Sequence, residues 1–426
     1  MKQKNSLQQP FLRVIIIALM AIILPPMAAR AHSVLVTGGA YDGHNLSFAE
    51  ATGTSVLYNL SDATAITLTG EWNETQLTGL RVAMKNSTDI TASNSKLTKA
   101  DMSATTLSGS FATAGKGISY LFHYCSALEE VNLPSGGSGE RVSFYATVDS
   151  CPNLTTITNL DKFTNVTDFG SAFNLCSRLP TITLTDVEND NGVSFYAAFQ
   201  SCSNLTTITN LEKFTNVTDF AYAFNFCSKL TTITFANVEN TNGVSFSTAF
   251  QDCTALTTIN NLDKFTKVTN FGNAFNGCSS LTSVRLGNIP TSVSNTFDST
   301  NPNCLKYLPA GSIVPDDWSS YSNVIIGTTA AGTIKLSDNS PFACPTDFEL
   351  GGNNIEFTRT AAWKYADRES GTGWNVLTLP FDADVMVDGV VATPFASGDD
   401  TEGSYWLRTF DGSSTTNGDV DVLSFG

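Results

Sequence analysis

The chain has 426 residues, a formal net charge of −16 and 42% hydrophobic residues. Such a hydrophobic content is typical of a globular protein and argues against intrinsic disorder. An acidic chain without a basic cluster repels nucleic acids and anionic membranes, so we expect neither as a partner.

The first 31 residues have the layout of a cleavable export signal. Three cations precede an apolar run over 14–24, and the small-residue signature Ala-Arg-Ala ends at Ala31. The run is short for a membrane span and is followed by two prolines. We therefore expect residues 1–31 to be removed, which leaves an exported chain without a membrane span. The first cysteine is Cys125, so no cysteine follows the signal to carry a lipid anchor.

Residues 32–118 contain segments that look like diverged repeats of irregular length. They are ITLTG at 66–70, QLTGLRVAM at 76–84 and LTKADMS at 97–103. Terminal units of a repeat array are atypical because they cap its end. The sequence therefore predicts an N-terminal capping region over 32–118.

A regular repeat follows over 119–310, where cysteines recur at alternating intervals of 26 and 25 residues. Near-identical copies 51 residues apart each contain two structural units with the pattern F-x-x-A-F-x-x-C-x-x-L-x-x-[IV]-x-[LFN]. The first half of a unit has the spacing of a short helical or 3-10 turn, and the alternation after Leu205 is typical of a strand. Such a unit cannot bury its apolar face alone, so the pattern predicts stacked coils in a parallel solenoid. The apolar turn positions of one unit are Phe195, Ala198, Phe199 and Cys202.

This repeat resembles the leucine-rich repeat L-x-x-L-x-L-x-x-[NC]-x-L, and most of all its bacterial BspA-type branch. The resemblance rests on AFNLCSRLPTITL (172–184), AFNFCSKLTTITF (223–235) and AFNGCSSLTSVRL (274–286), and it extends over 120–308. It implies a leucine-rich-repeat solenoid with a parallel β-sheet on one face and short helical or 3-10 turns on the other. It also implies an exported, non-catalytic scaffold for adhesion or recognition at the bacterial cell surface or outside the cell. The partner implied is a protein or a glycan.

The repeat cysteines share one register, and three roles are open to them. Export permits disulfides, and neighbouring coils lie about 4.8 Å apart, but parallel Cβ directions fit the disulfide torsion poorly. A metal site needs C-x-x-C pairs or nearby histidines, and neither accompanies them, so we expect no metal and no other cofactor. We favour the third role, a buried thiol that fills the turn before each strand. The repeat cysteines are Cys125, Cys151, Cys176, Cys202, Cys227, Cys253, Cys278 and Cys304.

No set of residues has the pattern of a catalytic site, so we expect no catalytic residue and no enzymatic activity. A nucleophile activated by histidine needs a histidine that the scaffold positions. The contexts of His32, His44 and His123 suggest no such role. The acidic segment 186–192 resembles a calcium loop only superficially, because Ala197 occupies the place of the closing glutamate.

Threonines are the most ordered exposed feature of the predicted solenoid, where they form two columns across the sheet. Threonine suits exposed strand positions without any further role. Alternatively, the columns form an uncharged, hydroxyl-rich face for a protein or a glycan. Ice binding is a remoter interpretation, and the breaks at Asn260 and Arg285 argue against it. The candidate face comprises Thr156, Thr158, Thr181, Thr183, Thr207, Thr209, Thr232, Thr234, Thr258, Asn260, Ser283 and Arg285.

Alternate units differ at one core-like position, where Asn159, Asn210 and Asn261 alternate with leucine or phenylalanine. These asparagines either bond the neighbouring backbone as a ladder or turn outward while the next leucine replaces them. The sequence leaves both arrangements open.

Residues 311–426 form a different, β-rich region that resembles the module following such repeats in related surface proteins. WNVLTLPFDADV (374–385) and YWLRTF (405–410) alternate in the manner of strands. The chain ends in DVDVLSFG as if within a strand, so we expect this module to be incomplete. An alternative function is a glycan-binding or glycan-processing accessory that works through the module. Its tryptophans, which suggest either core packing or a carbohydrate face, are Trp318, Trp363, Trp374 and Trp406.

Overall fold

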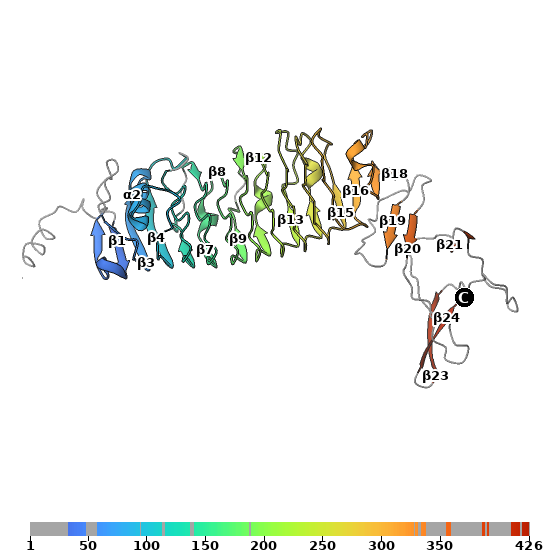
Figure 1. The fold of residues 1–426 in the computed structure, drawn as a ribbon, viewed down its shortest axis with the longest axis horizontal. Helices are drawn as coiled ribbons and strands as arrows, with labels where there is room; N and C mark the ends of the chain where they lie inside the picture. Colours follow the sequence, from blue (N-terminus) through green and yellow to red (C-terminus); the bar gives the residue numbers. More distant parts are fainter. Residues whose placement is uncertain are drawn as a thin grey trace, which may run out of the picture. The chain divides into compact units, whose positions relative to one another are not determined.

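Figure 1 shows the fold of the chain as a computed structural model. The structure describes residues 33–47, 58–93, 95–112, 116–136, 140–186 and 189–327, and beyond them the backbone of short strands between 329 and 425. The expected export signal at 1–31 and the tryptophans Trp363, Trp374 and Trp406 lie outside the described residues. The chain divides into two compact units, Met1–Arg359 and Thr360–Gly426.

The N-terminal region consists of a small sheet and one helix. Its elements are β1 (Ser33–Thr37), η2 (Gly39–Tyr41), β2 (Asn45–Ser47), β3 (Ala65–Trp72), α2 (Glu74–Lys85) and β4 (Lys99–Leu107). β1 pairs antiparallel with β2 and β3, and β3 pairs parallel with β4. Helix α2 is capped by Asn73, whose side chain accepts from the Gln76 N–H while the Gln76 side chain accepts from the Asn73 N–H. This reciprocal cap satisfies two N–H groups that the helix itself cannot.

Parallel strands, one from each coil, lie side by side in one row along the first unit, and we call this row the main sheet (Figure 1). β4 pairs with the first repeat strand, β5, which pairs with β7; the pairs β9–β11, β13–β14 and β15–β16–β17 follow. All of these pairings are parallel, as the repeat pattern predicts. The strands are β5 (Glu130–Asn132), β7 (Thr156–Thr158), β9 (Thr181–Thr183), β11 (Thr207–Thr209), β13 (Thr232–Thr234), β14 (Thr258–Asn260), β15 (Ser283–Arg285), β16 (Leu305–Leu308) and β17 (Val324–Ile326).

A second parallel row of short strands runs elsewhere along the coils. Its strands are β6 (Val142–Ser143), β8 (Val166–Asp168), β10 (Val193–Ser194) and β12 (Val217–Asp219). Alternate coils also contain a 3-10 turn, at η3 (Leu160–Lys162), η4 (Leu211–Lys213) and η5 (Leu262–Lys264). The alternation explains why the sequence repeats most closely at 51 residues, the length of two coils.

Short elements follow the last coil. η6 (Asp316–Trp318) precedes β17, which pairs antiparallel with β18 (Thr329–Ala330), and β19 (Ile334–Ser337) pairs parallel with β20 (Ile355–Thr358). The second unit contains two antiparallel pairs, β21 (Met386–Val387) with β22 (Val390–Val391), and β23 (Phe410–Asn417) with β24 (Val420–Phe425).

The segment before six of the eight repeat cysteines consists of two successive hydrogen-bonded turns, where the spacing predicts a single helical or 3-10 turn. The Ala198 N–H donates to Phe195 O at 3.0 Å, and the third residues of the two turns, Ala197 and Ser201, have φ values of 51° and 60°. The Ala197 N–H donates to Ala221 O of the next coil at 2.8 Å. The stacked coil supplies acceptors at a regular spacing, so alternate N–H groups bond between coils and not along a helix. The inward set predicted for this segment is buried as expected.

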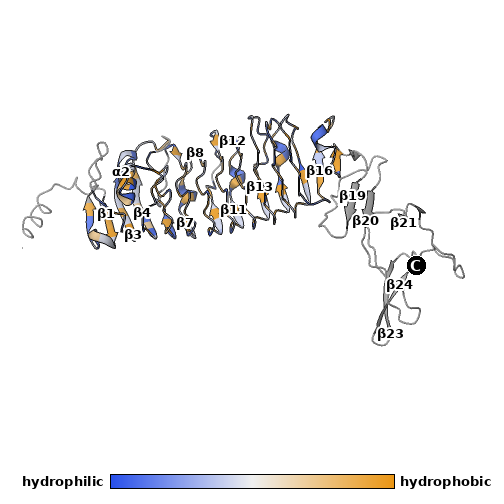
Figure 2. Cartoon of the chain, in the orientation of Figure 1, coloured by the Kyte–Doolittle hydropathy of each residue, from blue (hydrophilic) through white to orange (hydrophobic). Residues whose placement is uncertain are grey.

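Phenylalanine rings stack in a column through the core. Phe199 lies parallel to Phe173 with ring centroids 5.6 Å apart, and Phe224 follows at the same distance from Phe199. Phe250 and Phe275 continue the column at 5.5 and 5.4 Å. Apolar residues recur in the same way along the whole row of coils (Figure 2). Each coil therefore completes its core only with its neighbours, which is the energetic basis of a solenoid.

The eight repeat cysteines are buried thiols in this structure. Cys202 Sγ lies 3.0 Å from Phe173 O of the preceding coil, to which it donates. Burial raises the pKa of the Cys202 thiol to about 12, which keeps the proton in place as a donor. The same contact with the preceding coil occurs at Cys151, Cys176, Cys227, Cys253 and Cys278.

The alternating asparagines combine the two arrangements that the sequence left open. Asn210 has a left-handed backbone conformation, and its Nδ2 donates to Leu184 O of the preceding coil at 3.0 Å. The next residue, Leu211, is buried in the core. Equivalent bonds join Asn159 to Leu133 and Asn261 to Phe235. The asparagine is thus half-buried and bonded, while the following leucine fills the core position.

Candidate functional site

The two threonine columns lie on the outer face of the main parallel sheet. In β9, Thr181 and Thr183 are exposed on either side of the buried Ile182. Strand pairing puts Thr207 opposite Thr181 and Thr209 opposite Thr183, so the hydroxyls of adjacent coils face outward in register. Ten of the twelve candidate residues are exposed, and Thr234 and Ser283 are half-buried.

Side-chain hydrogen bonds link neighbouring coils within one column. Thr158 Oγ1 donates to Asn132 Oδ1 at 2.7 Å, and Asn260 Nδ2 donates to Thr234 Oγ1 at 3.0 Å. These bonds orient the hydroxyls without covering them. Asn132 and Glu130 extend the columns by one coil, because Glu130 pairs with Thr156 and Asn132 with Thr158.

Glu130 and Asn132 were not predicted to belong to the face, because their strand lacks the Thr-x-Thr motif. The spacing of Leu128, Val131 and Leu133 matches the L-x-x-[IV]-x-L part of the repeat and indicates one more strand of the sheet. All three of these apolar side chains are buried.

A third line of threonines forms hydrogen bonds between neighbouring coils. Thr206 Oγ1 donates to Pro180 O at 3.1 Å, and Thr257 Oγ1 donates to Thr231 O at 3.0 Å. Thr155 and Thr282 make equivalent bonds to the preceding coil. Because these hydroxyls donate to backbone carbonyls of the preceding coil, we do not include them in the candidate face.

Charged groups lie at the ends of the columns and not in their middle. Lys99 Nζ lies 2.9 Å from Glu130 Oε1, and the hydrogen bond from Lys99 lowers the pKa of the Glu130 carboxyl. At the other end the Arg285 guanidinium lies over the Tyr307 ring, 4.2 Å from its centroid. From β7 to β14 both columns consist of threonine, apart from Asn260. The middle of the face therefore offers hydroxyls and methyl groups without charge.

His123, the one histidine of the regular repeats, makes structural contacts. Its Nε2 lies 3.2 Å from Asp149 Oδ2, and its Nδ1 lies 3.0 Å from Ile90 O in the loop after α2. The ring also packs against Tyr120 and Tyr124. These contacts join the capping region to the first two coils. His44 is bonded to the backbone of Asp42, and His32 lies outside the described residues.

Metal-binding clusters and membrane-spanning helices are both absent from the residues that the structure describes. Within them, no group of three or more His, Cys, Asp or Glu side chains is placed to hold a metal ion. In the same part of the chain, no helix combines the length and apolarity needed to cross a bilayer. The segment that resembles a calcium loop contains Asn189, whose Nδ2 donates to Val166 O of the preceding coil at 3.1 Å.

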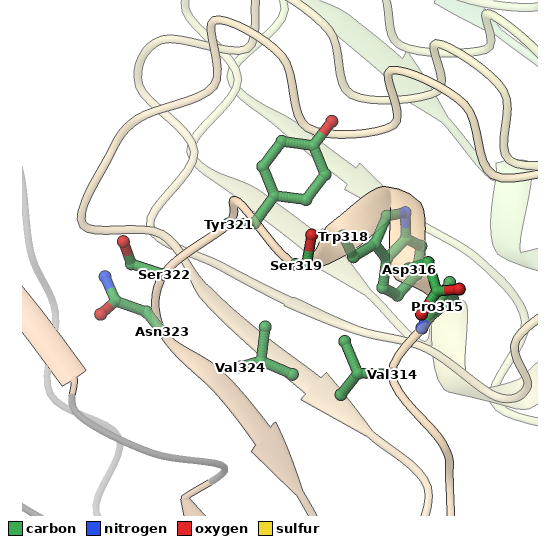
Figure 3. A pocket seen from close by; sticks show the side chains of 9 residues that line it. All are labelled: Val314, Pro315, Asp316, Trp318, Ser319, Tyr321, Ser322, Asn323 and Val324. Atoms are coloured by element: carbon green, nitrogen blue, oxygen red, sulfur yellow. The ribbon is translucent and has the colours of Figure 1, made fainter.

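A cavity of about 310 Å³ lies at the C-terminal end of the described coils (Figure 3). Trp318 is fully buried beside it, with Nε1 donating to Val293 O at 3.1 Å, so this indole packs in the core and presents no carbohydrate face. Tyr321 donates to Asp298 Oδ1 at 2.6 Å, and burial together with this bond raises the pKa of Tyr321 to about 12. The polar groups of Trp318 and Tyr321 beside the cavity thus stabilise the last coil. The cavity is lined by Val314, Pro315, Asp316, Trp318, Ser319, Tyr321, Ser322, Asn323 and Val324.

The chain is similar to several known proteins. A family model described as the BspA type leucine rich repeat region matches residues 103–221 and 193–311. A solved leucine-rich repeat protein from Bacteroides ovatus is 19% identical, with 64% of this chain and 61% of that one covered and a TM-score of 0.33. This chain therefore spans less than two thirds of that protein's length. A search of curated proteins found no match.

Two other solved structures are similar at lower identity. An internalin from Listeria monocytogenes is 16% identical, with 62% of this chain and 86% of that one covered and a TM-score of 0.22. The TLR13–ssRNA13 complex is 14% identical to this chain, with 67% and 46% covered and a TM-score of 0.22. The family match contains six copies of the repeat, and its residues are those that form the parallel coils. Residues 103–311 belong to the BspA-type leucine-rich repeat family.

Proposed function

We propose that the chain is an exported recognition scaffold without catalytic activity, which acts at the bacterial cell surface and binds a protein partner through the outer face of its main sheet. The observation that carries this proposal is the pair of uncharged threonine columns, in register and exposed over consecutive coils. The export pattern at 1–31 supports a location outside the cytoplasm.

The threonine face suits recognition for a physical reason. β-branched side chains have few rotamers, and these stand on hydrogen-bonded strands, so ordering them on binding loses little entropy. Each hydroxyl can both donate and accept, and each methyl group adds apolar contact. Without charge in the middle of the face, partner selection would depend on shape and hydrogen bonds more than on electrostatic steering.

The proposal can be tested by blocking the centre of the face. The double variant Thr207→Arg/Thr232→Arg places two long cations among the columns, and Thr241→Arg places one on an exposed loop away from them. Wild-type chain immobilised on beads should retain one or more proteins from a mixture of extracellular-matrix and cell-surface proteins. The double variant should lose at least ten-fold in that retention, and Thr241→Arg should not. Retention that is unchanged in the double variant, or absent in the wild type, would contradict the proposal.

A further inference from the structure

A second ordered surface lies on the paired turns that precede the cysteines. Four large apolar side chains from three consecutive coils are exposed there: Leu175 (45%), Tyr196 (42%), Tyr222 (36%) and Phe226 (49%). Together with Gln200, which lies between them in the sequence, we call these residues the turn-face patch. The rings of Tyr196 and Tyr222 are in edge contact, with centroids 5.9 Å apart. The patch is separate from the threonine columns, because it belongs to the turns and not to the main sheet.

The backbone at these positions does not favour large side chains. Leu175, Tyr222 and Phe226 have φ values of 59°, 59° and 60°, in the left-handed region where side chains with a Cβ are strained. Burial cannot account for them, since each side chain is a third or more exposed. Strained, exposed apolar side chains that bring so little to the core are an indication of function.

Neighbouring coils demonstrate that smaller residues are compatible with the same positions. The position of Leu175 and Phe226 is occupied by Ser150 and Ser201 in adjacent coils, with φ values of 59° and 60°. In the same way, Ala197 occupies the position of Tyr222. The fold therefore does not require a large apolar side chain at either position.

Amide side chains accompany the patch. Gln200 is half-buried, and its Nε2 donates to Asn225 Oδ1 at 3.1 Å, while Asn225 Nδ2 donates to Gln251 O at 3.2 Å. Asn174 Nδ2 similarly donates to Asp149 Oδ1 at 3.1 Å in the preceding coils. Asn225 itself is buried, so Asn174 and Gln200, which are both half-buried, are the amides that reach the surface beside the aromatic side chains. Their orientation is set before any ligand arrives.

We infer that the turn-face patch binds a neutral polysaccharide chain that runs along the solenoid. Aromatic rings pack well against the apolar faces of sugar rings, and amides pair with sugar hydroxyls as both donors and acceptors. Coils follow each other at about 4.8 Å, close to the length of one sugar unit, so equivalent large side chains two coils apart would meet every second unit. Leu175 and Phe226 are two coils apart, and Tyr124, which is 36% exposed, lies two coils before Leu175 in the same line.

Charge and arrangement favour this ligand over others. No residue of the patch is charged, and a net charge of −16 repels acidic polymers. A protein partner usually binds through aromatic and arginine residues clustered at the centre of an interface. Here Tyr124, Leu175 and Phe226 recur in one line at every second coil, which matches a ligand that itself repeats.

The test uses substitutions that the repeat already contains. Leu175→Ser and Phe226→Ser introduce the residue of Ser201, Tyr222→Ala that of Ala197, and Tyr196→Ala that of Ala221, so the fourfold variant should keep the fold. Affinity electrophoresis of the full chain in gels with laminarin, galactomannan, dextran or starch measures retention. We expect retention by at least one of these polymers and a loss of at least ten-fold in the fourfold variant. Val238→Ser, which removes another exposed apolar side chain (46%), should be retained like the wild type.

Three results would overturn the inference. They are the absence of retention by all four polysaccharides, equal retention of wild type and fourfold variant with an unchanged circular dichroism spectrum, and preferential retention by an acidic polymer such as hyaluronan. If the fourfold variant loses only a protein captured on beads, the patch is a protein interface and the polysaccharide inference is wrong. The arginine variants of the threonine face should keep polysaccharide retention, so failure of either proposal can be recognised separately.

Discussion

Two phenylalanines of one coil provide a quantitative test of how the solenoid is held together. Phe224 is fully buried, with ring centroids 5.6 Å from Phe199 and 5.5 Å from Phe250. Phe226, two residues later, is 49% exposed. Replacing each by alanine therefore compares the same chemical change inside and outside the stacked core.

The expected magnitudes differ several-fold. Phe224→Ala removes a buried ring and leaves a cavity between two coils, which should lower the free energy of unfolding by about 4 kcal/mol, a large part of a typical protein's stability. Phe226→Ala loses only half of a ring's burial, about 1 kcal/mol. Alanine is compatible with its left-handed backbone, as Ala146 and Ala197 demonstrate with φ values of 51°.

Urea unfolding followed by circular dichroism measures both effects, and amide hydrogen exchange locates them. Because a coil interacts mainly with its neighbours, Phe224→Ala should accelerate exchange most in the coils around residues 199–250, and less in β1–β4. Equal losses in the two variants would refute the reasoning. Acceleration of exchange to the same degree across the whole stack would refute its nearest-neighbour part.

Three further predictions concern the thiols, the response to alkali and the cap. The eight repeat thiols should resist a thiol reagent in the native chain and react after denaturation without reductant, as mapped by mass spectrometry; thiols that stay unreactive after denaturation would be bridged. Burial raises the pKa of Cys202 and Cys253 from 9.0 to about 12. As the pH rises, the unfolded chain therefore loses these protons before the folded chain does. The free energy of unfolding should be constant below about pH 8 and fall as the pH rises from 9 towards 12. Urea unfolding that is the same at pH 7.5 and pH 10 would argue against buried, protonated thiols. Asn73→Ala should lower the free energy of unfolding by about 1 kcal/mol through loss of the reciprocal helix cap. Relative to the wild type, hydrogen exchange should accelerate more in the first turn of α2 than in β13. Unchanged exchange at α2 would exclude a role for the cap.

The repeat pattern predicts much of this fold, because a spacing that indicates little in one unit is repeated in every unit of the stack. A three-residue strand such as Thr207–Thr209 has little stability alone, but identical spacing in successive units leaves parallel stacking as the simplest way to bury Leu205 and its equivalents. The family model matches these same residues, which confirms the predicted relationship.

Other features depended on contacts between coils and could not be predicted from spacing. Steps of three and four residues suit a helix as well as paired turns, and only the acceptors of the next coil decide between them. Helix α2 was not predicted although Asn73 and Gln76 have the spacing of a capping box, because the segment 76–84 also resembles a diverged repeat. The turn-face patch was missed because the inward phenylalanine, alanine and cysteine positions dominate the pattern, whereas the residues between them vary.

The asparagine bonds also determine how such a chain can change its length. Asn210 bonds to Leu184 of the coil before it, and Asn240 bonds to Val217 of the coil before it, so two kinds of junction alternate along the stack. Deletion or duplication of 193–243, a complete pair of coils, would recreate both kinds of junction. Removal of a single coil would bring two coils of the same kind together. An asparagine would then lose the backbone carbonyl of the preceding coil to which it donates. The unit of growth by recombination is therefore the pair, and a lineage of such proteins should differ in length by multiples of 51 residues.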